Sequence, residues 1–173
     1  MPVFKHGAFV DDPWQTVPDE APVPADAPAI VSKARFIAER ESLAGRNPPL
    51  GLALKAGESL DGIEGDIHRF AVIALDFPKY SDGRSYSTAR ILRERHGFAG
   101  ELRATGNVLR DQVNFMHRAG FDALDVTHAG TIAALQSGAV KFVSRHYQPA
   151  SVDTEELQPT PERPRLRITP GPA

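Results

Sequence analysis

The chain has 173 residues, of which 41% are hydrophobic and 24% are charged, and its formal net charge is −2. This size and composition are typical of one globular domain with tails. The sequence contains no cysteine, which excludes disulfide bonds, thiolate-bound iron–sulfur clusters and thiol redox chemistry carried by the chain itself.

The apolar runs are much shorter than the roughly 20 residues that a membrane-spanning helix needs. The opening residues, Met-Pro-Val-Phe-Lys, lack the apolar core of a secretory signal. We therefore expect a cytoplasmic protein that has no membrane partner.

Prolines divide the chain into three parts. Six of the fifteen lie in residues 1–28 and six in residues 149–173, which leaves three between them. Proline-broken polar sequence is typical of extended or disordered segments. We predict an extended or disordered segment over residues 1–29, one α/β domain over residues 30–148 and a disordered tail over residues 149–173. The ends are acidic, so they either keep the protein soluble, shield a basic surface or bind a partner.

The middle part alternates between helical and strand periodicity. We predict, in chain order, a helix over 32–43 capped by Ser32, a strand over 50–54, a short helix within 59–69, a strand over 70–75, a helix over 85–96 ended by Gly97, a strand over 101–104, a helix over 108–119 ended by Gly120, a strand over 121–126, a short helix over 131–136 and a strand over 140–143. This alternation indicates an α/β fold with a small parallel sheet, either open or a half-barrel.

In parallel α/β folds, ligands bind beyond the carboxyl ends of the strands. The loops that reach this edge span residues 77–85, 105–107 and 127–130. Their polar residues, which we expect to converge, are Lys79, Asp82, Arg84, Ser85, Tyr86, Thr105, Asn107, Arg110, Asp111 and His128.

The loop over residues 77–85 leads into an arginine-rich helix. Asp82-Gly83 is a turn signal, and Ser85 or Ser87 could cap the helix. Free N–H groups at a helix start and guanidinium groups both bind anions. We predict that Arg84, Arg90 and Arg110 converge on one concave face and bind a small oxyanion.

Several other kinds of chemistry lack their signatures. The sequence contains neither the glycine pattern of dinucleotide sites nor that of P-loops, and its six histidines form no metal-ligand spacing. Lys79 as a Schiff-base lysine and His128 as an acid–base partner of Asp125 are weaker hypotheses than an anion contact and a helix cap. The aromatic residues do not alternate with the basic ones as nucleic-acid stacking platforms do, so we expect no nucleic acid. We predict no metal and no standard cofactor, and leave open a non-standard flavin site.

Two long motifs, FPKYSDGRSYSTARILRER and GELRATGNVLRDQ, resemble domain-of-unknown-function family 934. The resemblance covers about residues 50–148. Its motif residues in this chain are Asp82, Gly83, Arg84, Tyr86, Ser87, Arg90, Arg93, Glu101, Arg103, Gly106, Asp111 and Gln112. Many members of that family have Cys where this chain has Ala119, so the resemblance gives no support to a thiol mechanism at that position.

Proteins of that family are typically encoded beside assimilatory sulfite reductase and are often labelled as oxidoreductases. The resemblance therefore implies an accessory protein of sulfite reduction, with sulfite reductase as the partner. The residues that we expect to bind the partner or an oxyanion are Lys79, Arg84, Ser85, Ser87, Arg90, Arg103, Asn107, Arg110 and Gln112. The alternatives are an enzyme acting on a small anion, in which Asp82, Tyr86 or Asp111 handles protons, and a purely structural partner of the reductase.

Overall fold

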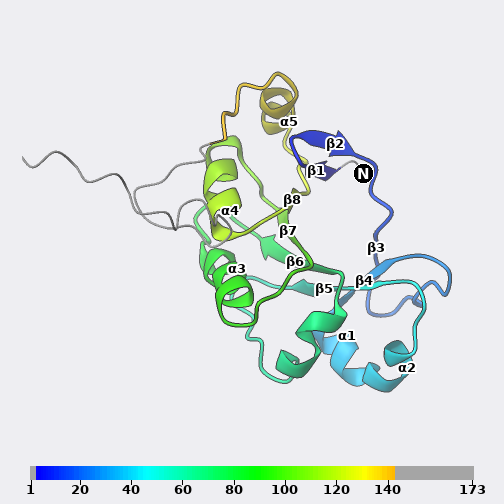
Figure 1. The fold of residues 1–173 in the computed structure, drawn as a ribbon. Helices are drawn as coiled ribbons and strands as arrows, with labels where there is room; N and C mark the ends of the chain where they lie inside the picture. The colour runs from blue at the N-terminus through cyan, green and yellow to red at the C-terminus, as the bar shows by residue number, and fades with distance from the viewer. Residues whose placement is uncertain (1–2, 143–173) are drawn as a thin grey trace, which may run out of the picture.

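The computed structural model describes residues 3–142, which form one eight-stranded sheet with helices (Figure 1). The strands are β1 (Val3–Lys5), β2 (Ala8–Val10), β3 (Gln15–Thr16), β4 (Ala29–Ser32), β5 (Leu50–Leu54), β6 (Val72–Phe77), β7 (Glu101–Gly106) and β8 (Ala123–Leu124). The helices are α1 (Lys33–Ala38), α2 (Arg40–Ala44), α3 (Arg84–Glu94), α4 (Val113–Ala119) and α5 (Ala129–Gln136), with 3₁₀ turns η1 (Glu64–Arg69) and η2 (Arg110–Gln112).

The strand order is β2-β1-β8-β7-β6-β5-β4-β3. Neighbouring strands from β3 to β8 are parallel, and β1 runs antiparallel to both β8 and β2. The predicted α/β class with a parallel sheet in an open, half-barrel form is therefore confirmed. Only β1 runs against the direction of the other strands, and both β1 and β2 come from the segment that precedes the predicted domain.

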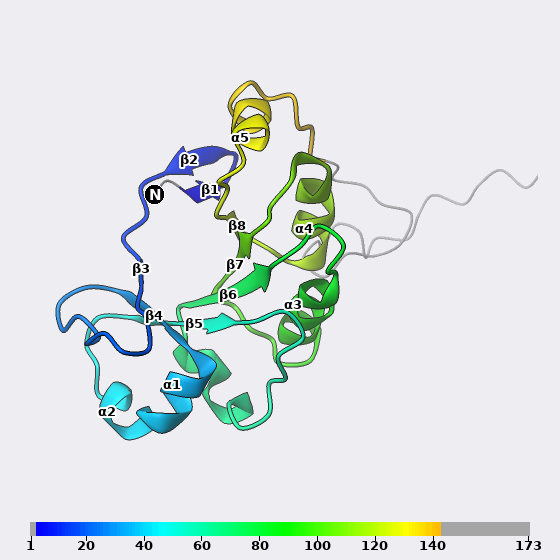
Figure 2. The same cartoon turned by 180° about the vertical axis from the view of Figure 1, so that it is seen from behind.

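The connection between β2 and β3 shows why the sheet curls. These strands are the two edges of the sheet, yet only residues 11–14 separate them. An extended chain from Val10 to Gln15 reaches at most about 18 Å, whereas seven strand spacings in a flat sheet would need about 34 Å. The edges must therefore approach each other, and residues 11–14, which we call the strap, bridge the open side (Figures 1 and 2).

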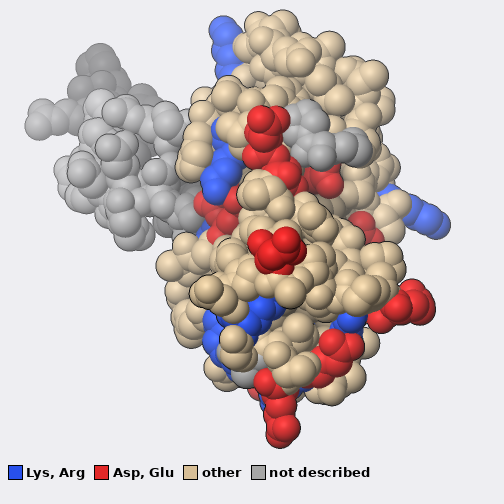
Figure 3. Space-filling view, turned by 90° about the vertical axis from the view of Figure 1, so that its right-hand side faces the viewer, with Lys and Arg blue, Asp and Glu red and all other residues tan. Residues whose placement is uncertain are grey.

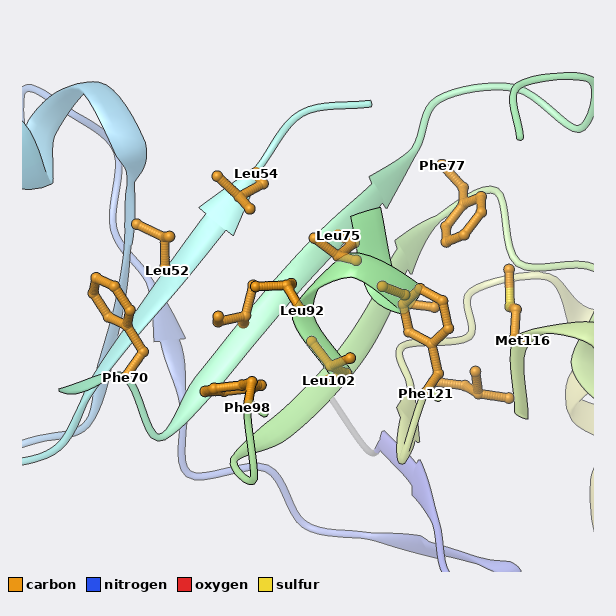
Figure 4. Close-up of a cluster of buried hydrophobic side chains, with 14 of the residues drawn as sticks. Leu52, Leu54, Phe70, Leu75, Phe77, Leu92, Phe98, Leu102, Met116 and Phe121 are labelled. Atoms are coloured by element: carbon orange, nitrogen blue, oxygen red, sulfur yellow. The ribbon is translucent and has the colours of Figure 1, made fainter. Parts of the chain in front are cut away.

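The main core lies between the sheet and the helices. Side chains alternate along each strand, so Leu52, Leu75 and Leu102 all face the helical side. Leu92 of α3 and Met116 of α4 pack into the same cluster (Figure 4). Because each fully buried side chain of this size contributes about 1.5–3 kcal/mol, this layer holds the helices in place.

The opposite, inner side of the sheet is lined by smaller side chains and covered by the strap. Ile30, Val72 and Ala74 form a second cluster, against which Trp14 packs. A Cβ atom added at Gly51 would lie 3.3 Å from the Trp14 ring and 2.8 Å from Ile30. Glycine at this position therefore leaves the room that the indole ring needs.

Acidic side chains gather on the face that carries the strap, seen in Figure 3. Asp12 of the strap forms an ion pair with Arg103 of β7, at 2.6 Å. The carboxylate of Glu101 accepts hydrogen bonds from both Arg103 and Lys5. In the predicted extended or disordered segment over residues 1–29, the described residues contribute β1, β2 and β3 to the sheet rather than lying apart from the domain. Its prolines break helices but do not prevent short edge strands, and its apolar residues Val3 and Phe4 are buried.

Most predicted elements inside the domain are found. The strand over 50–54 is confirmed as β5, Ser32 caps α1 by accepting from the N–H of Arg35, and Gly120 ends α4 with a φ of +105°. The predicted helix over 32–43 is two short helices that meet at Glu39. The strand β4 was not predicted, because its four residues gave too short a pattern.

Two more differences concern the predicted third and last elements. The helix expected within 59–69 is the short 3₁₀ helix η1. Gly62 and Gly65 in this stretch oppose a regular α-helix. Residues 140–142 of the predicted strand over 140–143 have no strand structure, and residue 143 lies outside the described residues, as does the predicted tail over residues 149–173.

Candidate functional site

The loops that follow β6 and β7 meet at the carboxyl edge of the sheet, as the sequence predicts. The buried amide of Gln112 joins them, because its Nε2 donates to the Tyr80 carbonyl at 3.3 Å while its Oε1 accepts from the Leu109 N–H at 3.2 Å. The N–H of Asn107 also donates to the Phe77 carbonyl, at 2.7 Å. Gln112 thus supports the loop rather than facing a ligand.

Gly106 allows β7 to turn directly beside β6. Its φ is +84°, and an added Cβ would lie 2.5 Å from the Asp76 carboxylate and 2.7 Å from the Phe77 carbonyl oxygen. Both the backbone conformation and the close approach therefore require glycine here.

Asp82 and Arg84 bind each other. The Asp82 carboxylate accepts from Arg84 Nε at 2.9 Å and from its NH2 at 2.7 Å, and it also accepts from the Arg84 N–H at the start of α3. The hydrogen bond from the guanidinium is the main reason that the pKa of Asp82 falls to about 2. Asp82 is therefore an ionised partner of Arg84 at neutral pH, not a proton donor.

The three arginines expected to converge are not brought together. Arg84 lies against Gly57, in the connection after β5. Arg90 lies further along α3 and pairs with Glu94, at 2.8 Å, on the exposed surface. Arg110 belongs to η2, on the β7 side of the loop after β6.

Arg103, which we expected to bind an anion or a partner, lies on the inner side of the sheet. It is 4% exposed, and its guanidinium donates to Asp12 and Glu101. Burial works to lower the pKa of Arg103, but its hydrogen bonds to the carboxylates of Asp12 and Glu101, together with their negative charges, outweigh burial, so that the pKa is raised. Its role in this fold is to hold the strap on the sheet.

The other predicted residues have mixed positions. Ser85 is buried and donates to the Asp76 carbonyl at 2.6 Å, so it does not cap α3 with its side chain. Asn107 and Asp111 are exposed, and Thr105 donates to the Leu75 carbonyl. His128 caps α5, where its Nδ1 accepts from the Thr131 N–H at 3.2 Å, which fits the helix-cap hypothesis.

A hollow of about 460 Å³ runs along α3 and contains Ser87. Its α3 side presents Arg84, Ser87 and Arg95, and its other side presents the acidic Glu58 and Glu64. Because the two walls carry opposite charges, this hollow does not favour anions. The described residues contain no group of three or more side chains suited to hold a metal ion.

Three aromatic rings lie at the same edge, and we call them the aromatic surface: Tyr80, Tyr86 and Phe115. Tyr80 is 60% exposed and Phe115 is 53% exposed. The ring centroids of Tyr86 and Phe115 are 4.5 Å apart in an edge-to-face arrangement, and Tyr86 packs below on Phe77. Burial is the main reason that the pKa of Tyr86 is raised to about 12, and the nearby Tyr80 raises it further. The Tyr86 phenol is thus protonated at neutral pH and does not act as a base.

Sequence reasoning missed Tyr80 and Phe115. A signal for Phe115 was present: the buried residues of α4 are Val113, Met116 and Ala119, and Phe115 does not belong to this i, i+3, i+6 stripe. Single exposed apolar residues are common, whereas adjoining exposed rings are typical of binding surfaces.

Two basic residues flank the aromatic surface. Lys79 precedes Tyr80, and Arg110 lies in the turn whose Gln112 binds the Tyr80 carbonyl. Neither forms an ion pair with any residue that the structure describes. Aromatic residues together with arginine are enriched in protein interfaces.

The geometry thus defines an α/β half-barrel protein with an exposed aromatic surface at the carboxyl edge of its sheet. The chain matches the family described as "Bacterial protein of unknown function (DUF934)" over residues 51–158. Because the match covers more than half of the chain, this protein belongs to that family. No curated protein and no solved structure matches it. Over residues 3–142, no helix has the length and apolar character needed to cross a membrane.

Proposed function

We propose that this protein is an accessory protein of assimilatory sulfite reduction, and that it binds sulfite reductase through the aromatic surface. The observation that carries the binding role is the exposure of Tyr80 and Phe115, both of which lie near the half-buried Tyr86. Full burial of a ring of this size is worth about 1.5–3 kcal/mol, and Tyr80 and Phe115 are still more than half exposed. A partner that covers them recovers this free energy.

The choice of partner rests on the motif resemblance described above. The motif FPKYSDGRSYS includes both tyrosines of the surface, and the motif GELRATGNVLRDQ includes Arg110 and the supporting Gln112. The residues that identify the family thus build and hold this edge of the sheet.

The enzyme alternative has less support from the geometry. Of its three proposed proton-handling residues, Asp82 is held as an ion by Arg84 and Tyr86 is held in its protonated form. The third, Asp111, is exposed on the surface.

Co-purification tests the proposal. Tagged protein and sulfite reductase from the same bacterium are expressed together, and the amount of reductase retained is measured. We expect a Tyr80→Ala/Phe115→Ala double variant to retain at least tenfold less reductase, since hot-spot aromatics each contribute about 2 kcal/mol or more. Ile37→Ala is the matched control, because Ile37 is a similarly exposed apolar residue, at 46%, on α1.

A growth experiment tests the biological role. A strain that lacks the gene should grow poorly on sulfate, and cysteine should restore its growth. The wild-type gene and the Ile37→Ala variant should complement the defect, whereas the double variant should not. Normal growth of the deletion strain on sulfate would refute a role in sulfite reduction.

A further inference from the structure

The charges around the aromatic surface indicate which charge a bound segment of the partner should have. Three arginines of α3 form ion pairs: Arg84 with Asp82, Arg90 with Glu94 and Arg93 with Asp122. Lys79 and Arg110 differ, because no described carboxylate lies within ion-pair distance of them. Their counter-ions can come from a bound molecule.

Acidic groups near these two cations reduce the local charge but do not cancel it. Asp82 lies close enough to Lys79 to feel its charge, yet both carboxylate oxygens of Asp82 bind Arg84. Asp111 is the neighbour of Arg110 in η2 and is exposed to solvent without an ion pair to a described residue. Because Asp82 and Arg84 neutralise each other, Lys79 and Arg110 have one exposed carboxylate beside them, that of Asp111.

Besides charge, a bound segment needs an apolar contact, and the aromatic rings supply it. Tyr86 and Phe115 meet edge to face at 4.5 Å, and the Tyr80 backbone is fixed by Gln112. Because the Tyr86 and Phe115 rings hold each other in place before binding, they lose little conformational freedom when a partner covers them. They form an apolar platform, on which a side chain of the partner can pack.

We propose that the partner segment bound at the aromatic surface is acidic and carries an aromatic or large aliphatic anchor, which packs against Tyr80 and Phe115 while its carboxylates bind Lys79 and Arg110. This inference rests on the proposed function for its site, and it names the chemistry of the partner's contact. A basic segment would instead place its charges beside Lys79 and Arg110, where like charges repel.

The test uses three synthetic peptides and the full-length, isotope-labelled protein. The first is acidic with one central tryptophan, EEDEWEEDE; the second has serine in place of the tryptophan; the third, KKRKWKKRK, is basic. Binding is measured from NMR chemical-shift changes up to millimolar concentrations. We expect the first peptide to bind, and the other two to bind at least about tenfold more weakly, since an anchor of this size contributes roughly 1.5–3 kcal/mol.

Two variants assign the contact to the surface. Phe115→Ala should weaken the first peptide about tenfold or more, and Arg110→Glu should weaken it while strengthening the basic peptide. Raising the salt concentration from 0.1 to 1 M should also weaken the acidic peptide, because the Debye length falls from about 10 to about 3 Å. Ile37→Ala should leave all three affinities unchanged.

The outcomes separate this inference from the proposed function. If the basic peptide binds best, or if none of the peptides binds, the acidic-segment inference is overturned, while loss of reductase retention in the double variant would still support the docking role. If the acidic peptide binds at Phe115 but the double variant retains reductase normally, the surface is an acidic-segment site and sulfite reductase is not its partner.

Discussion

On the inner side of the sheet, Lys5 and Arg103 are paired with Glu101 and Asp12 beneath the strap. At the carboxyl edge, Lys79 and Arg110 form no ion pair with a described residue, and two aromatic rings beside them are exposed. The first region uses charge to fix the chain to itself, and the second presents charge and apolar surface outward. The arginine-rich character of a sequence therefore does not by itself locate a binding face.

The largest effect should come from the inner side. Arg103→Ala leaves the carboxylates of Asp12 and Glu101 in a largely buried site without the guanidinium that binds them. Breaking a buried ion pair in this way costs about 3–5 kcal/mol. Urea unfolding should show this loss, and Arg90→Ala should cost less than about 0.5 kcal/mol, because its pair with Glu94 is exposed. Equal losses in the two variants would contradict the comparison.

A smaller but clear effect is expected from the turn that supports the carboxyl edge. In Gly106→Ala, alanine would have to adopt a positive φ, and its Cβ would lie 2.5 Å from Asp76 and 2.7 Å from the Phe77 carbonyl oxygen. We therefore expect a loss of about 2 kcal/mol or more in the free energy of unfolding. Gly138→Ala is the control, because Gly138 has a φ of +68° but no atom within 4 Å of an added Cβ. It should cost only about 1 kcal/mol. A similar cost for both would mean that the close approach at Gly106 has no energetic importance.

Tyr86 should make stability depend on alkaline pH. Burial raises the pKa of its phenol to about 12 in the folded protein, whereas the ordinary value is about 10. Because the folded state holds this proton more tightly, the stabilisation is complete below about pH 10 and is lost as the pH rises towards 12. The wild type should lose more stability than Tyr86→Phe over that interval. An absorbance titration at 295 nm should likewise show one late-ionising tyrosine that the variant lacks.

The smallest change in stability should come from the aromatic surface. Phe115→Ala removes a ring that is 53% exposed, so we expect a loss of about 1 kcal/mol, well below the roughly 3–5 kcal/mol of a buried phenylalanine. Thermal unfolding measures this change, and reductase retention measures binding on the same sample. A ring that matters for binding but little for folding would sharpen the contrast between the two regions. A large loss of stability would show instead that Phe115 belongs to the core.

The elements with strong local patterns could be predicted from the sequence. The nearly continuous apolar runs of β5 and β6, the N-cap at Ser32 and the stop at Gly120 depend on neighbouring residues alone. The short edge strands could not be found in this way, since β2 and β3 are stable only because other strands pair with them. The prolines of the N-terminal segment suggested disorder, although they are compatible with edge strands.

The sequence by itself determined the α/β class, the absence of thiol chemistry, the family and the position of polar loops at the carboxyl edge. Only the tertiary structure decided which charged residues at this edge are free of ion pairs with described residues and can bind a partner. Arg84 and Arg103 look alike in sequence, but contacts with Asp82 and with the strap's Asp12 neutralise them. The exposure of Tyr80 and Phe115 was decided in the same way. Availability depends on what packs or pairs with a side chain across the fold, and residues as far apart as Asp12 and Arg103 meet only after the sheet has curled.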